Sequence, residues 1–191
     1  MRPVQLTDGA LTLRCLERAD ETAWMDVRRR HRAWLSPWEA ATPPGRDEPP
    51  VTFSQLVRRE RRQWKDESGY PFVMVHDGAL VGRVTVSGIR WGAECGGSLG
   101  YWIAQSHAGR GLTTRAVALV SEFAFGRGLH RLEIAVRPEN TRSLRVARKL
   151  GFRDEGLRPS YLYIDGGWRD HLVFGLTQGE HRIGRYWSEG L

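Results

Sequence analysis

The sequence predicts an α+β fold in which a central, mostly antiparallel mixed sheet is flanked by helices. Two observations predict it. Helical patterns come first and are followed by strands joined by tight turns, and strand and helix patterns then alternate to the end. A chain of 191 residues without internal repeats suits one domain, so we expect a single domain over residues 1–191.

The first half of the chain predicts a strand, two helices and a loop. Residues 10–16 alternate between apolar and polar side chains as a strand does, and Asp20 is suited to be the N-cap of the following helix. The prolines between residues 36 and 50 predict a loop. Thr52 is then expected to cap a second helix that runs to about residue 67 with its apolar side chains on one face.

The second half predicts an antiparallel meander followed by alternating helices and strands. Asp77-Gly78 and Asp165-Gly166 have the composition of hairpin turns, and we expect Trp168, beside the later turn, to anchor the core. The expected strands are residues 70–76, 80–86, 97–104, 131–136, 152–157 and 168–176, and the expected helices are residues 111–125 and 141–150.

The composition is that of a globular protein outside the membrane. Hydrophobic residues make up 40% of the chain and charged residues 27%. No apolar run approaches the ~20 residues that span a bilayer, and the first residues lack the apolar stretch of a signal peptide, so we expect a cytoplasmic protein without membrane contact. Cys15 and Cys95 are expected as buried free thiols, and without closely spaced Cys or His pairs we expect no metal site.

Arginine supplies nearly all of the positive charge behind the net charge of +7. This excess favours partners that carry many phosphates, such as a phosphorylated cofactor, ribosomal RNA or other nucleic acid. The basic runs at residues 28–32 and 58–62 could touch RNA. Charged faces of amphipathic helices explain both runs as well, and we prefer that interpretation.

A glycine-bearing turn between a strand and a helix is the most informative motif. The strand is expected to end at Ala104, and Gly109 and Gly111 then let the backbone approach a ligand closely. Free amides at the start of the next helix, together with its dipole, form an anion site suited to a pyrophosphate. Arg110 and Arg115 are expected to add charge at its rim. A tight turn without a ligand is the alternative interpretation.

This stretch resembles the acyl-CoA loop of the GNAT acetyltransferases, whose pattern is Gln/Arg-x-x-Gly-x-Gly/Ala. Gly111 holds the central glycine, while Ala108 and Thr113 depart from the pattern. The resemblance implies the GNAT fold and acetyl-CoA as co-substrate. It also implies that backbone amides of a splayed strand, near Trp102 and Ile103, polarise the thioester carbonyl. The loop residues expected at the cofactor are Ala108, Gly109, Arg110, Gly111, Leu112, Thr113 and Thr114.

A second block strengthens the resemblance. Residues 137–143 and 147–152 are similar to the strand–Asn–helix–Gly-Phe unit of the family, which implies that Asn140 contacts the pantetheine arm. Asn140 also suits a helix-initiating turn. Many relatives place a tyrosine general acid where this chain has Val146. The resemblance implies instead that Ser143 protonates the departing thiolate, although a plain first-turn helix serine is an equal alternative.

A third block, residues 152–171, together with residues 34–39, resembles the RimJ-type ribosomal-protein-alanine acetyltransferases. It implies that the acceptor is the α-amino group of an N-terminal alanine or serine in a small-subunit ribosomal protein. Trp38, Glu39 and Tyr161 are then expected to contact the acceptor. An α-amino group has a pKa of ~8 and a lysine ~10.4, so an N-terminus loses its proton more readily.

The resemblance to the related RimL-type enzymes implies that Glu155 is the general base, with a pKa that partial burial raises. A solvated turn glutamate is the alternative, and Glu94 and Glu133 are reserve candidates. Two other functions stay open. One is acetylation of a small amine such as an aminoglycoside, a polyamine or an amino acid, and the other is a non-enzymatic acetyl-CoA-binding factor associated with the ribosome. A monomer and a homodimer are both compatible with the sequence.

Overall fold

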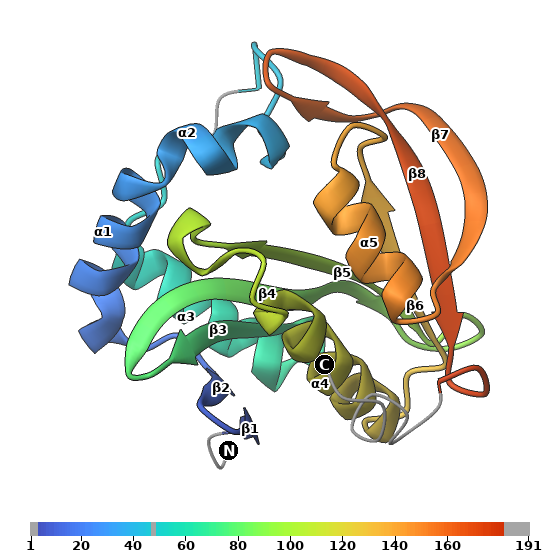
Figure 1. The fold of residues 1–191 in the computed structure, drawn as a ribbon, viewed down its shortest axis with the longest axis horizontal. Helices are drawn as coiled ribbons and strands as arrows, with labels where there is room; N and C mark the ends of the chain where they lie inside the picture. Colours follow the sequence, from blue (N-terminus) through green and yellow to red (C-terminus); the bar gives the residue numbers. More distant parts are fainter. Residues whose placement is uncertain (1–3, 47–48, 182–191) are drawn as a thin grey trace.

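The computed structural model describes residues 4–46 and 49–181. The ends of the expected domain, residues 1–3 and 182–191, and residues 47–48 of the expected loop lie outside the described residues. One sheet of eight strands organises this described part, in the order β1-β2-β3-β4-β5-β6-β8-β7 (Figure 1). All neighbouring strands are antiparallel except β5 and β6, which are parallel, so the expected mostly antiparallel mixed sheet is confirmed.

The elements agree closely with the sequence pattern. The strands are β1 (Gln5–Asp8), β2 (Leu11–Arg14), β3 (Tyr70–His76), β4 (Ala79–Arg90), β5 (Gly96–Ile103), β6 (Arg131–Val136), β7 (Arg153–Ile164) and β8 (Gly167–Thr177). The helices are α1 (Glu21–Arg30), α2 (Arg32–Leu35), α3 (Phe53–Lys65), α4 (Leu112–Gly126) and α5 (Thr141–Lys149), with short 3-10 turns at Arg18–Asp20, Ser36–Trp38 and Gln105–His107.

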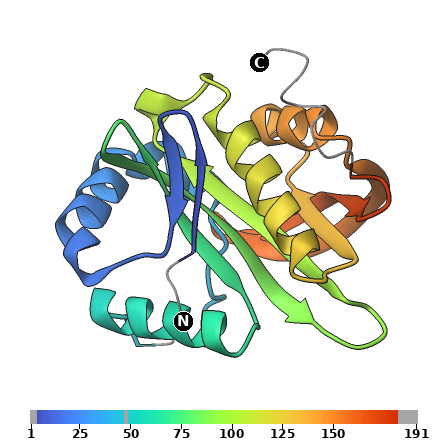
Figure 2. The ribbon, with the colours of Figure 1, turned by 90° about the horizontal axis from the view of Figure 1, so that it is seen from below.

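Helices cover both faces of the sheet. Figure 2 shows α1 and α3 on one side and α4 and α5 on the other. The main core lies between α4 and the central strands, where Phe72, Val84 and Val117 are fully or almost fully buried. A smaller apolar cluster joins α1 and α3 to β3. Among the described residues, no helix is long and apolar enough to span a membrane.

The divergence of β5 and β6 positions the functional site. These strands pair only between Gly96–Ser98 and Arg131–Glu133, in parallel. Beyond this point β5 stays with β4, and β6 stays with β8. A parallel pair that opens in this way leaves backbone groups of both strands without a sheet partner, which makes them available to a ligand.

Several local predictions are confirmed. Thr52 caps α3, and Gln55 completes a capping box that the sequence analysis did not include. Asp77 and Gly78 both have positive φ, at 50° and 77°, as a type I′ hairpin turn requires. Residues 131–136 form the strand that was expected.

Other local predictions are wrong. The first strand is half of a β1–β2 hairpin. Asp20 does hold the N-cap position of α1, but its carboxylate makes no hydrogen bond to that helix, because it accepts from Arg14 at 2.7 Å and from the Glu17 amide at 2.8 Å. Trp168 is 56% exposed rather than a core anchor, since residues 167–171 of β8 pair with β7 alone, beyond the end of β6. The cysteines are free, as expected, but only partly buried, and Cys95 lies in the β4–β5 turn at φ 44°.

Candidate active site

A cavity of about 760 Å³ lies where β5 and β6 diverge. Its walls come from α1, α2, β4 and β5, the turn before α4, and α5. A smaller cavity of about 160 Å³ extends towards β6 and β8. The two cavities are adjacent, and both are lined by Trp38, Gly100, Tyr101, Asn140 and Ser143.

The turn before α4 has the geometry of an anion site. Gly109 and Gly111 have φ of 79° and 74°, a conformation that glycine adopts without strain. A Cβ added at either glycine would meet nothing within 4 Å, so the backbone lies bare at the larger cavity. No side chain caps α4, which leaves its first amides free for a phosphate.

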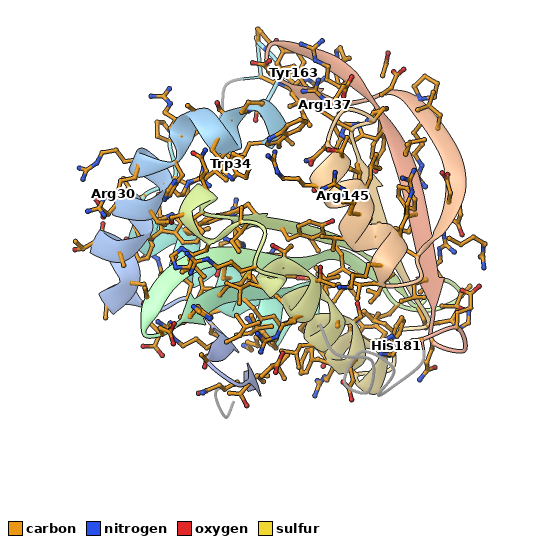
Figure 3. All side chains as sticks on the ribbon, in the orientation of Figure 1. Arg30, Trp34, Arg137, Arg145, Tyr163 and His181 are labelled. Atoms are coloured by element: carbon orange, nitrogen blue, oxygen red, sulfur yellow. The ribbon has the colours of Figure 1, made fainter. Side chains whose placement is uncertain are left out.

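Three cations from one face of α5 also face the larger cavity. Arg142, Arg145 and Lys149 line it, and none has an acidic partner within 4 Å among the described residues. The Arg142 guanidinium lies 4.6 Å from the centre of the Trp34 ring. Figure 3 shows Trp34 and Arg145 on facing elements, α2 and α5. Free amides and three cations fit the phosphates of a coenzyme A molecule.

The other end of the cavity is nearly charge-balanced. Glu39 is the one carboxylate that lines it among the described residues, and Arg28 binds it through two hydrogen bonds of 2.7 and 2.9 Å. Arg28 also lies over the rings of Trp24 and Trp102. Arg83, on β4, lines this end as well, and its guanidinium is paired with Glu60 of α3.

The edge of β5 supplies backbone groups to the opening. Ala104 donates its amide to Val81 on β4, so by alternation Trp102 also faces β4 while Ile103 faces the opening. The indole nitrogen of Trp34 donates to the Ile103 carbonyl at 3.0 Å. The Ile103 amide is therefore directed at the cavity, whereas Trp102 contributes its side chain rather than its amide.

Asn140 and Ser143 stand together at the start of α5. The Asn140 side chain accepts a hydrogen bond from the Ser143 amide at 3.1 Å, so it caps the helix and lines both cavities. The Tyr101 hydroxyl donates to the Ser143 carbonyl at 3.3 Å. Burial raises the pKa of Tyr101, so this phenol stays protonated and holds the first turn of α5 against β5.

The structure brings most of the expected site residues together. Those lining the larger cavity are Trp38, Glu39, Trp102, Ile103, Ala108, Gly109, Gly111, Leu112, Thr113, Thr114, Asn140 and Ser143. Arg110 is exposed and does not line it, and Arg115 is bound to Asp8 of β1 instead of the anion site. Tyr161 lies outside both cavities, 37% exposed, with its ring against His171.

Glu155 is not placed as the sequence suggested. Its carboxylate is bound by Arg131 and lies 3.2 Å from Arg153, on the outer part of β7. These contacts, the Arg131 hydrogen bond first, lower the pKa of Glu155, so the expected rise is wrong. Glu155 lines neither cavity. The reserve candidates are likewise held in ion pairs, Glu94 by Arg90 and Glu133 by Arg131.

A crossing segment, residues 36–41, forms the wall of the larger cavity at its charge-balanced end. Ala40 forms a β-bridge with Ile164, and the Ala41 amide donates to the Tyr163 carbonyl at 2.9 Å. Arg137 holds the same segment from the other side, because its guanidinium donates to the Pro37 carbonyl at 2.8 Å and lies over the Trp38 ring. Figure 1 shows the chain after α2 reaching the β7–β8 turn.

Sequence reasoning missed the residues whose role depends on tertiary contacts. The sequence analysis included Trp34 in a motif but did not predict its hydrogen bond to β5. It singled out neither Tyr101 nor the cations of α5. The periodicity of α5, with Arg142, Arg145 and Lys149 on one face, was the available signal. No group of His, Cys, Asp or Glu in the described part of the chain is suited to hold a metal ion.

Fold and cavity together define an acetyl-CoA-dependent acetyltransferase. The family model for the acetyltransferase (GNAT) domain matches residues 10–153, and the chain belongs to this family. The chain is 30% identical to the ribosomal protein uS5-alanine N-acetyltransferase of Escherichia coli (strain K12) over 188 residues, which cover 95% of each protein. It is similar to the solved structure of Mycobacterium smegmatis RimJ in complex with CoA-disulfide, with a TM-score of 0.84 and 36% identity over 93% of this chain and 88% of that one.

A relative with a different acceptor also aligns. The spermidine N(1)-acetyltransferase of Escherichia coli (strain K12) is 29% identical over 71% of this chain and 73% of that protein. The reaction class is therefore N-acetyl transfer from acetyl-CoA, and the acceptor has to be inferred from the cavity.

Proposed function

We propose that this enzyme acetylates the α-amino group of a protein N-terminus that begins with alanine or serine, presented by a small-subunit ribosomal protein. The observation that carries the proposal is the walled, nearly charge-balanced acceptor side of the cavity. The likeness to the uS5-alanine acetyltransferase over 95% of the chain supports it.

The crossing segment favours a substrate that enters by a free chain end. The crossing segment is bonded to the β7–β8 hairpin at Ala40 and Ala41, so a substrate must enter past a continuous rim. A free N-terminus can enter such a passage, whereas an internal loop would have to bring two chain segments. The neighbouring cavity of about 160 Å³ offers room for the first side chain of such a chain end.

The charge of the cavity disfavours polycationic acceptors. Spermidine and aminoglycosides carry several ammonium groups and need carboxylates to bind them. The Glu39 carboxylate is already neutralised by Arg28, and it is the one carboxylate that lines the larger cavity among the described residues. A single α-amino group with a pKa of ~8 carries less charge at neutral pH and loses its proton more easily.

The residues of the chain have distinct tasks in this reaction. Acetyl-CoA supplies an activated thioester. The first amides of α4 and the cations of α5 would hold its phosphates, and the Ile103 amide is suited to donate to the carbonyl oxygen as negative charge develops there. The Ser143 hydroxyl, on the first turn of α5, is suited to supply a proton to the departing sulfur.

A substrate panel tests the proposal. Purified enzyme is incubated with acetyl-CoA and peptides that differ only in the first residue, and mass spectrometry locates the acetyl group. We expect N-terminal alanine and serine peptides to be modified at the α-amino group. Matched peptides that begin with tryptophan, or that carry an internal lysine behind a blocked N-terminus, should be poor substrates. Rapid acetylation of spermidine, an aminoglycoside or a free amino acid, with no peptide modified, would refute the proposed acceptor.

A further inference from the structure

A buried histidine lies at the inner end of the acceptor side. His171, on β8, is 2% exposed and lines the smaller cavity together with Ser143 and Tyr101. The ring of Tyr161 meets the imidazole edge-on at 5.7 Å from the outside. The imidazole is therefore shielded from solvent and directed at the cavity that an acceptor amine would enter.

One hydrogen bond fixes which nitrogen of His171 carries the proton. Nδ1 lies 2.9 Å from the carbonyl oxygen of Arg169. A carbonyl can only accept, so Nδ1 is the protonated nitrogen and donates. Nε2 then carries a lone pair, and no hydrogen-bond partner for it occurs among the residues that the structure describes. A fixed tautomer with a free basic nitrogen is the arrangement required of a proton acceptor.

The surroundings keep this imidazole neutral. Burial lowers the pKa of His171, and the positive charge of Arg137 lowers it further. The backbone carbonyl of Arg169 and the carboxylates of Glu139 and Asp170 act in the opposite direction without reversing the shift. At neutral pH the Nε2 lone pair is therefore available.

We propose that His171 is the catalytic base of the acetyl transfer, in the role that the sequence suggested for Glu155. The proposal rests on the proposed function only in taking the smaller cavity as part of the acceptor side. Glu155 lines neither cavity, and its carboxylate is held by two arginines, so it is poorly placed to receive a proton there.

The proton balance of the step is simple. The amine nitrogen forms a bond to the acetyl carbon, and the electron pair of the C=O π bond moves to oxygen. The nitrogen becomes far more acidic once it is bonded to that carbon, so a neutral imidazole can remove its proton at Nε2. The carbonyl then re-forms, and the C–S bond breaks with its electron pair on sulfur. The proton on His171 returns to the thiolate through the Ser143 hydroxyl or solvent, so one N–H is exchanged for one S–H.

The test compares His171→Gln with the wild type on an acceptor that the wild type turns over. Glutamine keeps polar groups in the cavity but cannot accept a proton. We expect kcat to fall about 10²- to 10⁴-fold, with little change in acetyl-CoA affinity. In the wild type, kcat should decline as the pH falls through the pKa of the imidazole, which burial places below the ordinary histidine range. That acidic limb should be absent from the variant.

Chemical rescue separates catalysis from structure. His171→Ala opens space for added imidazole, which should restore part of the lost activity, and a purely structural role would not respond to it. His130→Gln is the matched control, because His130 is exposed and lines neither cavity. Circular dichroism and acetyl-CoA binding establish that each variant is folded.

Two results would overturn the assignment. One is wild-type kcat with an unshifted pH profile in His171→Gln. The other is a loss of the acidic limb in Glu155→Gln alone. Failure of the proposed acceptor is recognised separately, since it appears in the wild type as inactivity towards N-terminal peptides, and the His171 comparison is then made with the amine that is acetylated.

Discussion

Removal of the Arg83 guanidinium should lower the unfolding free energy, because it breaks a buried ion pair beneath the cavity. Arg83 Nη1 lies 2.6 Å from Glu60 Oε1, and the two side chains are only 18% and 5% exposed. Arg83 also lies 5.6 Å from the Trp24 ring centre, and its Nε donates to Thr85. The substitution Arg83→Met keeps most of the apolar stem and removes the charge, so that Glu60 is left in the interior without its cation.

The expected loss follows from this burial. Breaking a buried ion pair from one side costs about 3–5 kcal/mol of unfolding free energy, because the remaining charge is uncompensated. Burial already raises the pKa of Glu60, and Arg83 opposes that rise, so the pKa should climb further in the variant. A carboxyl whose folded pKa is raised favours the folded state at acidic pH and loses that contribution as the pH rises through the folded pKa. The difference in unfolding free energy between the wild type and the variant should therefore grow with pH, by up to about 1.4 kcal/mol per pH unit.

Urea unfolding followed by circular dichroism at pH 5 and pH 7.5 measures both quantities. We expect Arg83→Met to be clearly less stable than the wild type at pH 7.5 and closer to it at pH 5. The double variant Glu60→Gln/Arg83→Met, which removes both charges, should recover more than half of the loss. A deficit below about 1 kcal/mol at pH 7.5, or one that does not change with pH, would refute the argument from a buried, uncompensated carboxylate.

Two further predictions concern the acetyl-CoA end. Gly111→Val forces a β-branched residue to φ 74° and adds a side chain to the open cavity, so acetyl-CoA affinity measured by calorimetry should fall at least about tenfold. Gly111→Asn should weaken binding as well, although asparagine tolerates this φ. Gly78→Asn, in the distant hairpin turn, is the control and should leave the affinity unchanged. Normal acetyl-CoA affinity in folded Gly111→Val would contradict a cofactor site at this turn. Arg145→Gln should weaken acetyl-CoA binding about tenfold at low salt and less at high salt. Arg148→Gln, on the exposed face of the same helix, is its control, and equal effects of the two would argue against direct phosphate contact.

Features fixed by local chemistry were predictable from the sequence. Thr52 caps α3 because its hydroxyl reaches an amide three residues away, and Asp77-Gly78 forms a turn because both residues tolerate positive φ. The glycine turn between β5 and α4 could also be predicted, since a strand, two glycines and a helix follow one another closely. The exposure of Trp168 could not, because it depends on where β6 ends relative to β8.

The position of the base that we propose was the least predictable part of the site. Glu155 and His171 lie on neighbouring strands of one hairpin, yet only His171 faces the cavity. The alternation of each strand indicates two faces but does not say which face meets a partner, and β7 is irregular between Arg158 and Leu162. The Arg131–Glu155 ion pair, which holds the Glu155 carboxylate on the outer part of β7, joins residues on strands that are not adjacent in the sheet.

The contacts of the crossing segment have a consequence for the folding of the nascent chain. Ala40 pairs with Ile164, and Pro37 is bound by Arg137, so the acceptor wall depends on partners about a hundred residues or more away in sequence. Such contacts close long loops and form late, after local helices and hairpins. During synthesis the segment from β5 to α5, which we propose to hold the cofactor phosphates, can assemble before β7 has emerged from the ribosome. The enzyme would therefore acquire a cofactor site first and the ability to choose its acceptor only when the last hairpin is in place.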